Sequence, residues 1–251
     1  MPAYEKCMLK SPAISIVDAK LRYHDHILFD QLDFHLAAGQ TTCLLGASGV
    51  GKSRFLQLIA GLKPIFASAT ISACDQKSLS GRLAYMPQPN ALLPWLNILN
   101  NVLLGYRLRC RKKPYAHARK LLTQLGLSHT LKKYPAQLSG GMQQRVALAR
   151  VLLEDRPIVL MDEPFSALVM ITRYQLQELT ANLLKNRTVL LVTHDPLEAL
   201  RLGHHIAIMS GNPAKIEYLN YKLSDLPPRV LDNPHLLKWQ SQLLHRLQEL
   251  Q

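Results

Sequence analysis

Residues 46–53 read GASGVGKS and match the pattern G-x-x-x-x-G-K-[ST] at every constrained position. An apolar, β-branched stretch precedes them and a helical pattern follows, ending at Gly61. Glycines allow such a loop to curl so that backbone N–H groups face phosphate oxygens, and the helix N-terminus adds further donors. Lys52 is expected to reach the β- and γ-phosphates, and the Ser53 hydroxyl to ligate Mg²⁺. A chance glycine turn is disfavoured because strand and helix are both predicted.

A second candidate for chemistry is the carboxylate pair Asp162 and Glu163, which ends the apolar run of residues 158–161. Charges at the end of a buried strand need a partner. In a doubly wound sheet the carboxyl ends of the strands are where ligands bind. We therefore expect Asp162 to hold Mg²⁺ or its water, and Glu163 to polarise an attacking water. A surface acidic pair is the alternative.

The third stretch is LSGGMQQR, residues 138–145. Ser139 is a good helix N-cap, and the two glycines leave the N–H groups of the next helix open. This would be a second helix N-terminus that binds phosphate, but without a lysine of its own. Such an arrangement suggests that two copies of the chain sandwich a nucleotide between them.

These motifs need elements that bring them together. Residues 13–45 alternate as β-strands, residues 91–155 are helical, and residues 156–210 alternate between short buried strands and helices. Asp195 is predicted to cap a helix through Leu202, with Glu198 at the capping-box position. An amphipathic helix from Pro234 onward is predicted to pack on its own domain. The pattern favours an α/β fold with a mostly parallel sheet.

Composition narrows the class of protein. Of 251 residues 48% are hydrophobic and the net charge is +13, which is compatible with nucleic acid or an anionic membrane surface as a partner. The dense basic run is residues 107–113; a solvated loop is the simplest interpretation, and no aromatic residues interleave with it. Four widely spaced cysteines predict neither a metal site nor a disulfide framework. No signal peptide or membrane-spanning run is evident, so a cytosolic protein is expected.

Taken together, these motifs resemble those of the ATP-binding cassette (ABC) ATPases, the motor subunits of ABC transporters. Residues 46–53 match Walker A, residues 138–144 the LSGGQ signature, and residues 158–163 Walker B. Gln88 matches the Q-loop, His194 the switch histidine, and Tyr23 the aromatic residue that stacks on adenine. Residues 92–95 and 146–150 further resemble the importer branch for nitrate, sulfonate, taurine and thiamine precursors.

The resemblance implies a P-loop NTPase core with an N-terminal antiparallel β subdomain and a helical signature subdomain. One ABC domain would span residues 1–251: a core of 1–87 and 156–212, a helical subdomain of about 88–155, and a C-terminal extension of 213–251. ATP and Mg²⁺ are the implied cofactors. The implied partners are a second copy, a transmembrane permease and, indirectly, a solute-binding protein; no nucleic acid is expected. The location would be peripheral, on the inner face of the membrane.

The resemblance also implies a role for each site residue. Glu163, His194 and Gln88 would be catalytic, and Ser53, Gln88 and Asp162 would hold Mg²⁺. The nucleotide would be bound by Tyr23, Gly46, Ala47, Ser48, Gly49, Val50, Gly51, Lys52, Ser53 and Arg54. The ATP of the opposite subunit would meet Leu138, Ser139, Gly140, Gly141, Met142 and Gln143.

One position departs from the family pattern. Val169 stands where the family almost always has Asp, in the D-loop that crosses the dimer interface. Valine cannot make a carboxylate's hydrogen bonds, so weakened communication between the two sites is expected. Two alternatives to a transport motor remain open: a poorly hydrolysing regulatory subunit, and a non-transport cassette ATPase acting on ribosomes or DNA.

Overall fold

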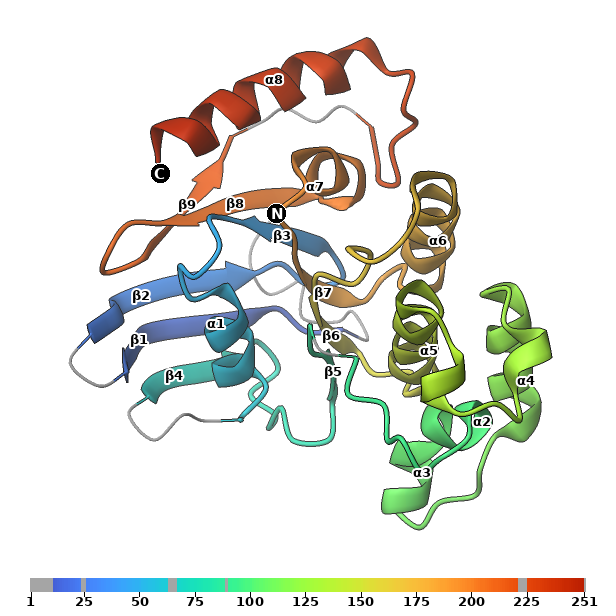
Figure 1. The fold of residues 1–251 in the computed structure, drawn as a ribbon. Helices are drawn as coiled ribbons and strands as arrows, with labels where there is room; N and C mark the ends of the chain where they lie inside the picture. Colours follow the sequence, from blue (N-terminus) through green and yellow to red (C-terminus); the bar gives the residue numbers. More distant parts are fainter. Residues whose placement is uncertain (1–10, 24–25, 63–66, 89, 221–224, 251) are drawn as a thin grey trace.

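The computed structural model describes residues 11–23, 26–62, 67–88, 90–220 and 225–250. Its larger sheet has six strands in the order β5-β6-β7-β3-β8-β9, and all neighbours are parallel except β8 and β9 (Figure 1). The strands are β5 (Leu83–Met86), β6 (Ile158–Asp162), β7 (Thr188–Val192), β3 (Thr41–Leu45), β8 (His205–Ser210) and β9 (Lys215–Leu219). Every residue of β6 and β7 is buried, which explains why both strands are apolar except for Asp162 and Thr188 at their ends. The predicted α/β fold is confirmed.

A second, antiparallel sheet has the order β2-β1-β4 and is formed by β1 (Ile14–Tyr23), β2 (His26–Leu36) and β4 (Ala67–Ala73). Helix α1 (Lys52–Ile59) joins the two sheets through one hydrophobic cluster. Phe55 of α1 is fully buried and meets Phe29 and Phe34 of β2 edge-on, with ring centroids 5.9 and 5.4 Å apart. The helix that follows the glycine loop is thus anchored on both sheets.

The helical lobe contains α2 (Ile98–Val102), α3 (Leu104–Leu108), α4 (Tyr115–Gln124) and α5 (Gly140–Leu153). Helices α2, α3 and α4 project at one end of the molecule (Figure 1). Helix α5 packs beside β5, and the lobe shares a hydrophobic cluster with one side of the six-stranded sheet. The lobe corresponds to the helical region expected from the sequence, while the exact subdomain boundaries remain a prediction.

The remaining helices are α6 (Met170–Leu183), α7 (Pro196–Leu202) and α8 (Pro234–Glu249). Leu236 and Leu243, seven residues apart on α8, are fully buried, and α8 lies against α7. The predicted amphipathic C-terminal helix therefore packs on its own domain.

Two smaller expectations were wrong. Asp195 caps α7 by accepting from the N–H groups of Leu197 and Glu198, but the Glu198 side chain is buried and bonds to Gln177 instead of closing a capping box. Cys74 is disulfide-bonded, although the spacing of the cysteines predicted no disulfide framework. Spacing along the sequence does not reveal such a pair, because pairing depends on tertiary distance.

Candidate functional site

The glycine loop between β3 and α1 depends on backbone conformations that side chains disfavour. Gly46 has φ +152°, and a Cβ atom there would lie 2.3 Å from the carbonyl oxygen of Met209 in β8. Gly51, directly before α1, has φ +111°. Only glycine allows the chain to leave β3 so close to β8 and then turn into the helix. The pattern found in the sequence is therefore a requirement of the backbone.

Lys52 lies within the curl of this loop. Its ammonium group donates to the carbonyl oxygens of Gly46 and Ala47, each at 2.7 Å, and the residue is only 7% exposed. Burial lowers the pKa of Lys52, while the carboxylates of Glu163 and Asp162 act in the opposite direction. The carbonyl groups of the loop thus fix a buried cation beside the space that a phosphate group would occupy.

A cavity of about 280 Å³ opens beside Lys52. Its lining is Leu28, Ser48, Gly49, Gly51, Lys52, Ser53, Arg54, Gln88 and Glu163. A helix N-terminus, a glycine loop, a lysine and a hydroxyl face one space, so the residues present fit the phosphate chain of a nucleotide. Arg54 is exposed and also donates to Gln57 Oε1 at 3.0 Å.

Asp162, at the end of β6, is a candidate metal ligand. It is 2% exposed, and burial raises its pKa, against which a hydrogen bond from the Ser53 side chain acts. The side chains of Asp162 and Ser53 thus come from different elements and touch. Paired oxygen donors next to a phosphate site suit Mg²⁺, which commonly takes one or two protein ligands there.

Glu163 is held from two sides. Gln88 Nε2 donates to Glu163 Oε2 at 3.2 Å, and His194 Nδ1 lies 3.2 Å from Glu163 Oε1. Glu163 itself adopts φ +48°, a left-handed conformation that non-glycine residues rarely adopt. Segments following β5, β6 and β7 thus converge on one carboxylate at the edge of the cavity. The three residues predicted to be catalytic are brought together.

The signature stretch forms the N-terminus of α5. Ser139 caps the helix by accepting from the N–H of Met142 at 3.3 Å, and Ser139 and Gly140 are exposed. Leu138 is buried, and Met142 packs against the core. Gln143 Nε2 donates inward to the carbonyls of Pro135 and Leu138. Among the described residues, the lining of the loop cavity includes no part of residues 138–143.

Gly141 lies against the turn that follows Glu163. A Cβ atom there would be 3.0 Å from the carbonyl oxygen of Ala167 and 3.4 Å from Leu168 Cδ2. A side chain at the second signature glycine would therefore press on this turn, so glycine favours the close packing of α5 against it.

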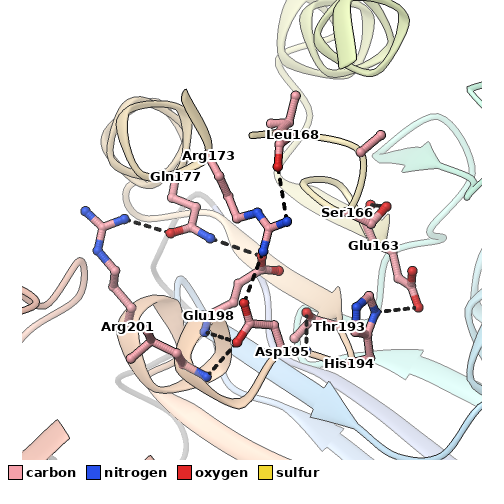
Figure 2. A network of polar contacts seen from close by, with 12 residues as sticks. Glu163, Ser166, Leu168, Arg173, Gln177, Thr193, His194, Asp195, Glu198 and Arg201 are labelled. Carbon is pink, nitrogen blue, oxygen red and sulfur yellow. Dashed lines mark hydrogen bonds and ion pairs between the residues drawn. The ribbon is translucent and has the colours of Figure 1, made fainter. Parts of the chain in front are cut away.

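Two residues that the sequence interpretation passed over hold this turn. Gln144, buried in α5, donates through Nε2 to the Glu163 carbonyl (2.8 Å) and the Ser166 hydroxyl (3.2 Å), and its Oε1 accepts from Ala167 N–H. Figure 2 shows Arg173 of α6 between the Leu168 carbonyl, at 3.1 Å, and Asp195 Oδ2, at 3.4 Å. Asp195 directly follows His194. No signal in the sequence marked this role of Gln144, because its partners lie about 20 residues further along the chain.

Tyr23 is the last residue of β1, and its side chain lies outside the described part of the structure. Its predicted role in stacking on adenine therefore stays a prediction. No cluster of His, Cys, Asp and Glu that could hold a metal on its own occurs among the described residues.

The geometry agrees with what comparison finds. A family model described as "ABC transporter" matches residues 29–166. The chain belongs to the ABC transporter ATP-binding family. An "Uncharacterized ABC transporter ATP-binding protein" of Haemophilus influenzae is 41% identical, over 93% of this chain and 98% of that protein. "Aliphatic sulfonates import ATP-binding protein SsuB 1" of Rhodococcus jostii is 36% identical, over 94% and 96%.

The fold of this ABC ATPase is similar to that of solved cassettes. The "Dimeric Structure of MJ0796, a Bacterial ABC Transporter Cassette" aligns with a TM-score of 0.71 and 26% identity, covering 83% of this chain and 99% of the other. A post-hydrolysis state of the same cassette "bound to ADP and Pi" aligns with a TM-score of 0.72, 26% identity and coverage of 85% and 100%. The protein is accordingly an ATP-binding ATPase of a transport system. None of its described helices is long and apolar enough to cross a membrane.

Proposed function

We propose that this ABC ATPase drives import of a small solute through a membrane permease, as a head-to-tail pair of identical copies. The observation that carries the proposal is the Glu163 carboxylate, held by Gln88 and His194 at the edge of the phosphate cavity. A general base must lie within hydrogen-bond reach of the reacting water, at a fixed orientation. Three separate segments supply that orientation here.

In this mechanism the protein contributes position and charge. Lys52 and the N–H groups of residues 49–53 hold the β- and γ-phosphates, which places the terminal phosphorus in front of Glu163. Glu163 orients the attacking water, while His194 lies beside the γ-phosphate. Ser53 and Asp162 would hold Mg²⁺, with Gln88 beside them; when bound, the ion neutralises charge on the phosphates.

A second copy would complete each site. Ser139 and Gly140 are exposed at a helix N-terminus, and their N–H groups and hydroxyl suit a γ-phosphate. The similar cassettes named above are described as dimeric. Ser139 and Gly141 of one copy would then meet the nucleotide held by residues 46–53 of the other.

We propose the transported solute and the partner proteins from the names of similar proteins. Several proteins about one-third identical to this chain are named aliphatic sulfonate import subunits. The solute proposed is therefore a small organic or inorganic anion of this class, delivered by a solute-binding protein. The lobe of α2 to α5 and the neighbouring Gln88 would contact the permease, which places the subunit on the inner face of the membrane.

The test is the variant Glu163→Gln, which keeps the size of the side chain and removes the base. ATP hydrolysis by the purified protein should fall by about 10²- to 10³-fold, because general-base catalysis contributes factors of this size. Light scattering with ATP and Mg²⁺ should show a dimer that persists. EDTA should abolish hydrolysis in the unmodified protein.

Glu249→Gln, a matched change at the end of α8, serves as the control and should leave hydrolysis unchanged. Undiminished hydrolysis in Glu163→Gln, or a monomer in the presence of ATP and Mg²⁺, would contradict the proposal. A protein that dimerises with ATP but never hydrolyses it would instead favour the regulatory alternative.

A further inference from the structure

The positive charge of this chain is concentrated in one lobe. Residues 88–153 contain eleven lysines and arginines and no aspartate or glutamate, whereas the net charge of the whole chain is +13. The rest of the chain is therefore close to neutral. This segment contains α2, α3, α4 and α5, which lie together in the structure (Figure 1).

The densest part of the lobe is exposed and short of opposite charges. Arg107, Arg111 and Lys112, at the end of α3 and in the loop before α4, are exposed. Among the described residues they form no ion pair, and the neighbouring Arg109 pairs with Glu154 of the adjoining segment. Further exposed cations follow on α4 at Arg119 and Lys120. We call residues 107–120 the cationic patch.

Apolar groups stand among these charges. Leu108 is 74% exposed and Tyr115 is 46% exposed. Basic side chains around an exposed leucine and tyrosine suit the surface of a bilayer, where cations meet lipid phosphates and apolar groups enter the boundary layer. Stacking of single-stranded nucleic acid on the nearby Tyr106 is disfavoured, because Arg109 already covers this ring. The Arg109 Cζ atom lies 5.4 Å from the ring centroid.

We propose that the cationic patch binds the anionic lipid headgroups of the membrane in which the permease lies. This inference rests on the proposed function, which brings the lobe of α2 to α5 to that membrane. The patch would add lipid contacts to those with the permease and would limit how far the lobe moves from the surface. Each basic residue at an anionic surface contributes about a fivefold factor in partitioning.

The experiment is co-sedimentation of the purified full chain with vesicles of phosphatidylcholine, alone or mixed with phosphatidylglycerol. Binding is expected with the anionic vesicles only, and raised salt should abolish it. Replacing Arg107, Arg111 and Lys112 together by Gln should lower the partition coefficient by about 100-fold. The matched control replaces the exposed Arg22, Lys215 and Lys238 by Gln, which changes the net charge equally; its binding should fall much less.

An equal loss of vesicle binding in both triple variants would overturn the proposal, since it would show that binding depends on the net charge of the chain and not on the cationic patch. No binding to anionic vesicles, or tighter binding to a DNA duplex at the same salt, would overturn it as well. ATP hydrolysis without lipid should be unaffected by either triple variant. If hydrolysis is absent in the unmodified protein the proposed function fails, whereas normal hydrolysis without vesicle binding refutes the lipid site alone.

Discussion

Two buried carboxyl groups illustrate how surroundings decide what a residue does. Burial raises the pKa of both Asp162 and Glu198. Asp162 has the Lys52 ammonium and the Ser53 hydroxyl near it, which favour its charged form and suit it to a metal ion. Glu198 accepts from Gln177 Nε2 at 3.0 Å, deep between α6 and α7 (Figure 2). Its pKa is raised to about 8, so near neutral pH it is largely protonated.

This raised pKa predicts a pH-dependent stability. The folded state binds the Glu198 proton more tightly than the unfolded chain, whose pKa is near 4.5. The free energy of unfolding should therefore fall as the pH rises from about 4.5 to about 8. Glu198→Gln cannot ionise, so denaturant unfolding at pH 5 and pH 9 should show a smaller loss, by on the order of 1–3 kcal/mol. Glu217→Gln on the surface is the control; equal pH dependence in both variants and the unmodified protein would refute the assignment.

At the scale of elements, the N-terminus of α6 is unusual. Val169 occupies the N-cap with β-region dihedrals, φ −67° and ψ 145°, but offers no side-chain acceptor. It is 77% exposed, and Met170 and Ile171 beside it are exposed as well. Helix starts normally have Asp, Asn, Ser or Thr here. The sequence departure at Val169 thus removes a helix cap in addition to the expected contact with the other copy.

Val169→Asp should restore both features. The new carboxylate would accept from an open N–H of α6 and should raise the free energy of unfolding by about 1 kcal/mol. If the loop also links the two copies, the rate of ATP hydrolysis and its cooperativity in ATP should rise. Val169→Asn supplies a cap without charge and separates the two effects. Unchanged rate and cooperativity in Val169→Asp would exclude the weakened communication.

At the scale of the whole molecule, one chain of contacts joins the signature end to the hydrolytic end. Gln144 of α5 hydrogen-bonds to the turn after Glu163. Arg173 of α6 donates both to the end of that turn, at Leu168, and to Asp195, which is next to His194. The signature helix that one copy offers and the carboxylate that serves its own ATP are therefore connected through one turn, residues 163–168. A shift of the signature helix should therefore change the position of Glu163, and the reverse should hold as well.

Arg173→Met breaks this connection without touching the nucleotide cavity. The kcat for ATP should fall by roughly 10- to 100-fold, because Glu163 and His194 lose their fixed spacing, while the KM should change little. The Hill coefficient for ATP should also decrease. Arg187→Met, at a surface ion pair with Asp155, is the matched control. A change in KM alone, or an unchanged Hill coefficient, would contradict the connection.

The motifs and their order were readable from the sequence because they depend on local chemistry. Each motif reflects a conformation that its own backbone must adopt. This holds for the glycine loop before a lysine, for the buried strand that ends in carboxylates, and for the serine before two glycines. Hydrophobic periodicity likewise predicted the parallel strands and the packing of α8, since burial of one face or both leaves a repeat in the sequence.

Contacts between distant groups depend on how the sheets and helices pack together. Several contacts join elements that are far apart in the chain. Gln88 and His194 approach Glu163, and Gln144 and Arg173 hydrogen-bond to the turn after it. Glu198 is buried beside Gln177. Such contacts depend on how the sheet and helices pack, and no local repeat encodes them. Packing also decided that Leu108 is exposed among the cations of the helical lobe. Local chemistry therefore determined the reaction class, and packing determined how its parts are held and connected.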